Sequence, residues 1–236
     1  MPRVTVPPAV KPLLRRLGQL ADEQGLAAYA VGGCVRDWQQ GTGHTVDLDV
    51  TVEGDGIRLA RSAAEDLGGE LTVHAQFGTA TLHGLPPPVR RLDVASCRRE
   101  TYAEPAAYPR VARGSLREDL FRRDFSINAM AVSLAPRQFG RLVDPFHGSA
   151  DLVARRLRVL HARSFLDDPS RILRGVRFQQ RFGLRWEPRT RRWLDQAMAR
   201  GALSWLNAGR LQRELERMCQ EPEPLACFRE LAGLLR

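Results

Sequence analysis

The sequence reads Val46-Asp47-Leu48-Asp49-Val50-Thr51-Val52 over a stretch in which apolar and polar side chains alternate without a break. Successive side chains of a β-strand point to opposite faces of its sheet, so the alternation predicts a strand over residues 46–52. Its apolar side chains would pack into a core, and Asp47, Asp49 and Thr51 would share the other face. Carboxylates two residues apart on one strand lie roughly 7 Å apart at Cα and can converge on a shared pair of cations. Because hard oxygen ligands suit Mg²⁺, the stretch predicts a metal site at Asp47 and Asp49.

A glycine pair stands shortly before this strand. Residues 27–31 form a short apolar run that predicts another strand, Gly32-Gly33 follow it, and residues 34–40 predict a short helix. Glycines at a strand end let backbone N–H groups approach a triphosphate, and the N-terminus of a helix favours the anion. Taken singly, Gly-Gly also fits a plain tight turn, and Asp-x-Asp also fits a solvated strand face. Their joint occurrence around one short helix is a much more specific pattern.

The rest of the chain divides into a mixed first half and a helical second half. Residues 98–114 contain little periodicity, which predicts a long loop. Helices are predicted over residues 7–24, 56–67, 168–182, 188–200 and 208–219. Further strands are predicted over residues 70–74, 79–83, 91–95, 131–134 and 142–143. We therefore expect one domain over residues 1–145 and a helical domain over residues 146–236, joined near residues 145–155.

The charge balance points to a polyanionic partner. The chain carries 36 Lys and Arg residues against 27 Asp and Glu residues, a formal net charge of +9. Lys11 is the only lysine. A GC-rich genome would explain why arginine replaces lysine, but it would not explain why basic residues outnumber acidic residues. A positive surplus of this kind favours binding of nucleic acid or nucleotides.

Neither a membrane anchor nor a structural metal is indicated. No apolar run approaches the ~18 residues needed to span a bilayer, and residues 1–5 lack the apolar stretch of a secretory signal. A cytoplasmic location without a membrane partner is expected. Because the cysteines show no Cys-x-x-Cys spacing, we expect buried, reduced thiols rather than a zinc site or disulfides. The four cysteines are Cys34, Cys97, Cys219 and Cys227.

The pattern of Gly-Gly, short helix and Asp-x-Asp resembles the polymerase-β-like nucleotidyltransferase superfamily. The resemblance implies an α+β fold in which a mixed sheet is flanked by helices. In that superfamily a third carboxylate comes from a neighbouring strand. Asp93 is the best candidate, because Leu92 and Val94 face away from it in the predicted strand over residues 91–95. The implied catalytic carboxylates are therefore Asp47, Asp49 and Asp93.

Further segments resemble class II tRNA nucleotidyltransferases and bacterial poly(A) polymerases. Residues 31–37, followed by 47–49, look like their first motif, and Arg122-Arg123-Asp124-Phe125-Ser126-Ile127-Asn128-Ala129-Met130 is similar to their second. The third, fourth and (loosely) fifth motifs are matched by residues 144–152, 167–178 and 210–215. The second and fourth matches are long and specific. The resemblance implies a nucleotidyltransferase head domain followed by an all-helical neck domain that selects the nucleotide and binds RNA.

The resemblance also implies roles for individual residues. Asp47 and Asp49 would hold the metals, and the guanidinium fork of Arg36 would contact the triphosphate. The second motif would bind phosphate and recognise the ribose hydroxyls. The implied nucleotide-binding residues of the second motif are Arg122, Arg123, Asp124 and Asn128, and Gly32 and Gly33 of the first motif join them.

The fourth motif has a physical logic of its own. Asp167 or Asp168 can cap the predicted helix, and Pro169 fits its first turn. Asp168 and Arg171 are three residues apart and would lie on one helix face. In the family, this pair imitates the Watson–Crick edge of a template base and selects the incoming base. A basic stripe that could follow RNA phosphates extends along the same helix through Arg174, Arg177 and Arg181.

The sequence departs from the family pattern in three places. The family usually has Glu-Asp where this chain has Asp167-Asp168, which leaves fine base selectivity open. The loop over residues 100–111 looks more like loops from lineages that split CC-addition and A-addition between two enzymes, which favours A-addition. Family members continue into body and tail domains that grip the tRNA elbow, whereas this chain stops at Arg236. Body and tail are therefore expected to be absent, through a compact design or a truncation, with tRNA grip weakened or supplied by a partner.

The implied function is template-independent addition of A, and possibly C, to the 3′ end of tRNA. The nucleoside triphosphates ATP and possibly CTP would be the donors, pyrophosphate would leave, and two Mg²⁺ ions would assist. The sequence does not indicate an oligomeric state. A poly(A) polymerase acting on general RNA 3′ ends shares most of the motifs, and a non-catalytic remnant would retain RNA binding alone. Nucleotidyl transfer to an antibiotic needs Gly-Gly and Asp-x-Asp but not the second and fourth motifs.

Overall fold

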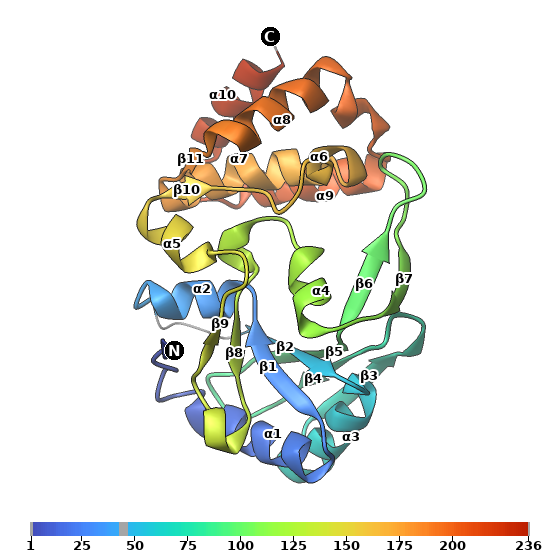
Figure 1. Cartoon of the computed structure of the whole chain (residues 1–236), viewed down its shortest axis with the longest axis vertical. Helices are drawn as coiled ribbons and strands as arrows, with labels where there is room; N and C mark the ends of the chain where they lie inside the picture. Colours follow the sequence, from blue (N-terminus) through green and yellow to red (C-terminus); the bar gives the residue numbers. More distant parts are fainter. Residues whose placement is uncertain (1, 43–46, 236) are drawn as a thin grey trace. The chain divides into compact units, whose positions relative to one another are not determined.

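The computed structural model describes residues 2–42 and 47–235 (Figure 1). The chain divides into two compact units, and each is described by itself. The first comprises Met1–Arg99, Val111–Arg123 and Ile127–Ser149, and the second comprises Glu100–Arg110, Asp124–Ser126 and Ala150–Arg236. This division is more interleaved than the single boundary expected after residue 145, because two short internal segments belong with the second unit. Val46, expected to begin a strand, lies outside the described residues.

A mixed sheet of seven strands forms the centre of the first unit, in the order β3-β4-β5-β2-β1-β8-β9. Strands β2 and β5 run parallel, and every other neighbouring pair in the sheet is antiparallel. The mixed α+β architecture expected from the sequence is therefore confirmed. The strands are β1 Ala27–Val31, β2 Asp47–Glu53, β3 Glu70–His74, β4 Thr79–His83, β5 Arg91–Ser96, β8 Ala131–Ser133 and β9 Leu142–Val143.

Two long helices cover the apolar face of this sheet. Helix α1 (Lys11–Glu23) and helix α3 (Gly56–Leu67) pack against each other and share one core with the sheet (Figure 1). Leu17, Leu59 and Leu48 are fully buried in that core. Burying a leucine side chain stabilises a fold by roughly 2 kcal/mol, so this face of β2 is fixed toward the helices. The opposite face of β2 therefore carries Asp47 and Asp49, as the alternation predicts.

Two shorter helices of the first unit carry predicted site residues or lie beside them. Helix α2 (Gly33–Gln39) follows β1, and helix α4 (Leu116–Phe121) precedes the second motif. Ser115 caps α4, because its side chain accepts a hydrogen bond from the Glu118 backbone while the Glu118 side chain bonds back to Ser115. The Leu116 backbone N–H also donates to Glu53 Oε1 at 2.7 Å, which ties α4 to the end of β2.

The prediction of a long loop over residues 98–114 is wrong in part. Strands β6 (Arg98–Thr101) and β7 (Arg110–Arg113) pair with each other as a separate two-stranded sheet. All four residues of β7 are exposed. A strand without a buried face needs no apolar alternation, so the sequence carried no periodic signal for it. Pro105 and Pro109 lie between the two strands.

Over residues 150–235 the second unit is helical apart from one pair of two-residue strands, β10 (Arg156–Leu157) and β11 (Arg185–Trp186). Leu173 and Val176 pack with Met218, Cys227 and Leu231 in its core. The predicted helices over residues 188–200 and 208–219 are confirmed within a residue. The helices are α5 Gly148–Val153, α6 Ser164–Asp167, α7 Ser170–Phe182, α8 Pro188–Ala199, α9 Ala208–Cys219 and α10 Pro224–Leu234.

Helix α7 begins two residues later than predicted. Asp168 has extended backbone angles (φ −138°, ψ 91°) and ends the short helix α6, while Pro169 occupies the N-cap of α7. The pyrrolidine ring of a proline disfavours helical angles in the residue before it, which accounts for the break at Asp168. Asp168 therefore stands just before the helix rather than on its face.

The structure bears on the expectations of buried, reduced cysteines and of a chain without a membrane-spanning helix. Cys34, Cys97 and Cys227 are buried free thiols, as expected, but Cys219 is a free thiol on the surface. Burial raises the pKa of Cys34 and of Cys97 to about 12, so both stay protonated at neutral pH. Within residues 2–42 and 47–235, no helix has the length and apolarity to cross a membrane.

Candidate functional site

Three predicted carboxylates lie on the adjacent parallel strands β2 and β5, where Asp49 and Asp93 are register partners. The Asp93 oxygens both have protein partners: Thr81 Oγ1 donates to Oδ1 at 2.7 Å, and Arg91 Nε lies 3.0 Å from Oδ2. Asp47 differs, because Arg91 Nη2 lies 3.8 Å from its Oδ2, while its buried Oδ1 has no hydrogen-bond partner in residues 2–42 and 47–235. The structure thus brings the carboxylates to one region of the sheet and leaves one buried oxygen of Asp47 unused.

The surroundings of Asp49 disfavour its charged form. Burial raises its pKa, and the negative charges of Asp93 and Asp47 add to the effect, while Arg123 and Arg91 oppose it. In the described part of the chain, no three or more His, Cys, Asp or Glu side chains are grouped as a metal site. Asp47 and Asp49 therefore remain the candidate metal ligands on the chemistry of their oxygens and on the unpartnered atom of Asp47.

The Gly32 turn lies next to Asp49 and to the second motif. Gly32 has φ +76° and ψ −133°, a backbone conformation that glycine adopts more readily than residues with a side chain. A Cβ atom at Gly32 would lie 3.0 Å from Arg123 Nη1 and 3.8 Å from Asp49 Oδ2. The missing side chain therefore lets the arginine close against the turn. Helix α2 starts at Gly33, directly after this contact.

Arg36 links the first motif to the second. Its side chain is buried, and its Nη1 donates to Asn128 Oδ1 at 2.7 Å. Its Nε and Nη2 lie 2.8 and 2.7 Å from Asp37 Oδ1. Two residues predicted as nucleotide-binding, 92 positions apart in the sequence, are thus in direct contact.

Arg122 and Arg123 share one acidic partner that the motif analysis missed. Asp119 on α4 has no exposed surface. It accepts from Arg122 Nη2 at 2.8 Å and from Arg123 Nη2 at 3.0 Å. The sequence did contain a signal, since an acid three and four residues before two arginines sits on the same helical side as both.

The second unit contains the fourth-motif residues. Asp168 Oδ1 accepts from Ser170 N at 3.0 Å, Ser170 Oγ at 2.6 Å and Arg210 Nη2 at 2.5 Å. Arg171 is buried, with its Nε 3.9 Å from Asp168 Oδ2. The predicted pair is therefore together, although Asp168 is not helical. Arg210, from the loosely matched fifth motif, is a further member of the group.

The predicted basic stripe on α7 is largely neutralised by acids. Arg174 Nη2 bonds to Asp124 Oδ2 at 2.5 Å, which joins two predicted nucleotide-binding residues. Arg177 lies between Glu221 (2.9 Å) and Glu214 (3.1 Å), and Arg181 donates to Glu221 at 2.7 Å. The sequence could not show the pairs of Arg177 and Arg181, because Glu214 and Glu221 come from α9 and the turn after it, about 40 residues away.

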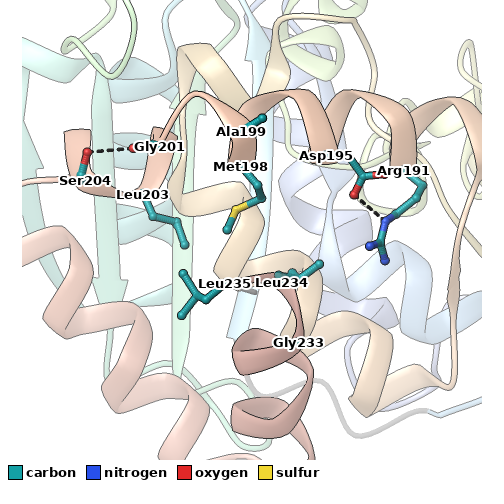
Figure 2. A pocket seen from close by; sticks show the side chains of 10 residues that line it. All are labelled: Arg191, Asp195, Met198, Ala199, Gly201, Leu203, Ser204, Gly233, Leu234 and Leu235. Atoms are coloured by element: carbon teal, nitrogen blue, oxygen red, sulfur yellow. Dashed lines mark hydrogen bonds and ion pairs between the residues drawn. The ribbon is translucent and has the colours of Figure 1, made fainter.

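The second unit also has a cavity of about 540 Å³ (Figure 2). Met198, Leu203, Leu234 and Leu235 form its apolar lining at α8, the turn after it and the end of α10. An ion pair between Arg191 Nε and Asp195 Oδ1, 2.8 Å long, lies at its edge. Every predicted site residue lies outside this lining.

Comparison with known proteins finds one matching family and several similar chains. Residues 28–158 match the family described as the poly(A) polymerase head domain. An A-adding tRNA nucleotidyltransferase from Halalkalibacterium halodurans is 42% identical over 224 residues, covering 94% of this chain and 52% of the relative. An A-adding tRNA nucleotidyltransferase from Geobacter sulfurreducens is 43% identical over 234 residues, covering 99% of this chain and 26% of the relative.

A solved structure agrees in fold. The apo form II of a CCA-adding enzyme superposes with a TM-score of 0.91 at 42% identity, over 97% of this chain and 53% of that one. The chain therefore spans about half, or less, of the length of the proteins that it matches. Because the head-domain match covers more than half of the chain, the protein belongs to the family of the poly(A) polymerase head domain.

Proposed function

We propose that this chain is the catalytic part of a template-independent nucleotidyltransferase that adds A from ATP to the 3′ end of tRNA and releases pyrophosphate. The observation that carries the proposal is the meeting of Gly32, Arg123 and Asp49 at one turn beside the β2–β5 carboxylates. A glycine turn with an adjacent guanidinium suits a triphosphate, and the carboxylates suit the cations that accompany it. Both A-adding relatives support adenosine as the added nucleotide.

The residues present fit Mg²⁺. Asp47 Oδ1 is a buried carboxylate oxygen to which no described residue donates a hydrogen bond, and Asp49 lies two residues along the same strand face. Such hard oxygens are the ligands that Mg²⁺ prefers. We assign Asp47 and Asp49 as the ligands. When bound, the ions would activate the attacking hydroxyl and neutralise the leaving pyrophosphate. Asp93 would complete the catalytic carboxylates, held in orientation by Thr81 and Arg91.

The chain's own cations and amides would position the nucleotide. Arg123 presents its guanidinium group beside the Gly32 turn, where it would bind phosphate oxygens, and Arg122, held by the same Asp119, would add a second guanidinium group for the phosphates. The contact between Arg36 and Asn128 would fix the Asn128 amide for the ribose hydroxyls. In the second unit, Asp124 would act with Arg174, its bonded partner. Arg177 would act indirectly, by holding α7 against Glu214 and Glu221.

Base choice would rest on Asp168 and Arg171. Three donors occupy Asp168 Oδ1, so Oδ2 is the oxygen left to accept from a base. Adenine offers an amino donor beside a ring-nitrogen acceptor, and a carboxylate paired with a guanidinium offers the complement. Cytosine presents the same donor–acceptor order, whereas uracil and guanine present the reverse. This chemistry supports ATP, with CTP as the possible second donor, and disfavours UTP and GTP.

A poly(A) polymerase is the second candidate, because the matching family carries that description. The deciding experiment incubates the chain with Mg²⁺ and each nucleoside triphosphate in turn. The acceptors are a tRNA ending in CC, a tRNA lacking all three terminal residues and an unstructured RNA. One adenosine added to the first acceptor alone supports the proposal. Long tails on both tRNA and unstructured RNA identify a poly(A) polymerase.

A matched control separates catalysis from RNA binding. Asp47→Ala removes a metal ligand from a strand face outside the core, so the fold should persist while incorporation is lost. RNA binding without incorporation by the unaltered chain would identify a non-catalytic RNA-binding remnant instead. Normal incorporation by Asp47→Ala would refute the metal assignment.

A further inference from the structure

A buried carboxylate outside the predicted site holds both arginines of the second motif. Asp119 has no exposed surface, and both of its oxygens are used. Oδ1 accepts from Arg122 Nε at 3.0 Å and Nη2 at 2.8 Å, and also from the Arg98 backbone N–H at 3.3 Å. Oδ2 accepts from Arg123 Nη2 at 3.0 Å. Burying a carboxylate is costly unless it is paired and hydrogen-bonded, and here two guanidinium groups and one amide supply those bonds.

The position of Arg123 depends on this carboxylate. While Nη2 contacts Asp119, the other terminal nitrogen, Nη1, lies 3.0 Å from the place where a Gly32 Cβ would be. Among the residues that the structure describes, Arg123 Nε is buried and has no hydrogen-bond partner. Within this part of the chain, Nη2 alone anchors the guanidinium group, and that bond directs Nη1 toward the glycine turn beside Asp49.

The anchor is itself held rigidly. Helix α4 carries Asp119, its first turn is closed by the Ser115–Glu118 capping box, and Leu116 N donates to Glu53 at the end of β2. Strand β2 also carries Asp49. Asp119, which orients Arg123, is thus held against β2, the strand that carries Asp49 beside the Gly32 turn. Few free torsion angles separate the two carboxylates.

We infer that Asp119 is a positioning residue for the triphosphate of the incoming nucleotide. It acts through Arg123, holds that guanidinium group toward the Gly32 turn and touches no substrate atom. The inference rests on the proposed function for the identity of the triphosphate. The pKa of Asp119 is consistent with it: burial raises the value, but Arg123 and Arg122 outweigh burial and lower it, so the carboxylate stays charged.

The test compares two isosteric neutralisations on one short helix. Asp119→Asn removes the charge that holds the arginines. Glu118→Gln removes the neighbouring charge, which in the described residues bonds to Ser115 and pairs with Arg99, and glutamine can still close the capping box. We expect Asp119→Asn to raise the KM for ATP at least about tenfold, the size of a lost charge-assisted contact, with a smaller fall in kcat. Glu118→Gln should leave the KM within about twofold. A KM for ATP within twofold of the unaltered chain in folded Asp119→Asn overturns the inference.

A double-mutant cycle tells positioning from plain structural support. If Asp119 acts through Arg123, adding Asp119→Asn to Arg123→Ala should change the KM by less than about twofold. Independent, multiplying effects of the two substitutions contradict the inference. Asp119→Glu keeps the charge but moves it by one methylene, and it should recover part of the lost affinity. If Asn, Glu and Ser at position 119 all prevent folding, the carboxylate serves the fold and the inference fails.

A binding measurement separates this inference from the proposed function. Calorimetry with inorganic tripolyphosphate and Mg²⁺ reports on the anion site without requiring incorporation. Weaker tripolyphosphate binding by Asp119→Asn supports the inference even if the unaltered chain adds no nucleotide to any RNA, an outcome that refutes the proposed function alone. Equal binding by both proteins, with normal incorporation by the unaltered chain, refutes the inference alone.

Discussion

At the scale of single residues, two atoms of charged side chains in the proposed nucleotide site are buried and lack a partner. Asp47 Oδ1 and Arg123 Nε make no hydrogen bond with any residue that the structure describes. Leaving such a group unsatisfied costs on the order of 1–3 kcal/mol, and native folds retain few of them. One atom can accept from a cation and the other can donate to an anion. A metal–triphosphate pair is the ligand class that would satisfy both.

Arg171→Ala should loosen base choice more than it slows the chemistry. The substitution removes the donor half of the proposed pair while Ser170 and Arg210 still hold Asp168. A well-placed bidentate contact discriminates by roughly 1–3 kcal/mol, so the kcat/KM ratio of ATP to UTP should fall about tenfold or more. Single-nucleotide incorporation with each of the four triphosphates measures it, and Arg192→Ala on exposed α8 surface is the matched control. An unchanged ratio would argue against the template-imitating role.

Arg177→Gln should destabilise the second unit. The side chain is buried between Glu214 and Glu221. Its loss leaves these two buried acids with Arg217 and Arg181 as their remaining partners in the part of the chain that the structure describes. Breaking a buried pair costs about 3–5 kcal/mol, and the remaining arginines should reduce this to about 2 kcal/mol. Urea unfolding measures it against Arg191→Gln, whose exposed pair with Asp195 is worth less than about 1 kcal/mol. Equal stability of the two variants would contradict this assignment.

At the scale of helices and strands, the sequence predicted many of the elements that have one buried face and missed strands without one. Helices α4 and α10 were also missed, although both bury apolar side chains. The boundaries of β1, β3, β4 and α3 agree with the predictions to the residue. Each either alternates or repeats its apolar residues against the core. The exposed strand β7 left no such pattern, and β10 and β11 are two residues long, too short for any period. The α7 start was misplaced because Asp168 fits a helix cap in composition, while Pro169 excludes it from the helix in conformation.

The candidate site divides along the same physical line. Residues joined by short-range spacing, such as Asp47 with Asp49, could be placed from the sequence, because strand geometry alone relates them. The partners of Arg177, 37 and 44 residues away, could not. Nothing local distinguishes an arginine that will meet buried acids from one that will meet solvent. The basic stripe was therefore predicted from helical spacing and found to be paired.

Gly175→Ala tests packing inside α7. Alanine is favoured over glycine in a helix by about 1 kcal/mol, yet a Cβ here would lie 2.1 Å from the Trp186 ring and 3.0 Å from Phe125. Overpacking typically costs about 1–3 kcal/mol, so the net effect should be a loss of about 1 kcal/mol or more. Gly209→Ala on exposed α9, where the nearest atom would be 3.7 Å away, is the control and should not destabilise. Thermal unfolding of both variants decides, and a higher Tm for Gly175→Ala would mean that Trp186 yields easily.

At the scale of the whole molecule, the net charge differs from the positive charge that remains available to bind a polyanion. The formal charge of +9 predicted a polyanionic partner. Many arginines are nevertheless held by acids, as Arg174 is by Asp124 and Arg181 by Glu221. Arg213 is exposed on α9 and makes no ion pair or side-chain hydrogen bond within the described parts of the chain. Phosphates of a long RNA should therefore be met by exposed arginines of this kind rather than by the α7 stripe.

This distinction predicts how RNA affinity responds to salt. Each phosphate contact to a single strand contributes roughly −0.7 to the slope of log affinity against log salt, so about four contacts would lower tRNA-end affinity roughly 50-fold between 50 and 200 mM salt. Arg213→Gln should reduce the slope by about 0.7 because it removes one contact. Arg177→Gln, measured where the variant is still folded, should keep the slope, because its charge is already neutralised by Glu214 and Glu221. Fluorescence anisotropy with a labelled acceptor-end RNA over a salt series measures all three proteins. A slope that falls for Arg177→Gln and not for Arg213→Gln would show that α7 opens its ion pairs to bind RNA, and would return the phosphate-binding role to the stripe predicted from the sequence.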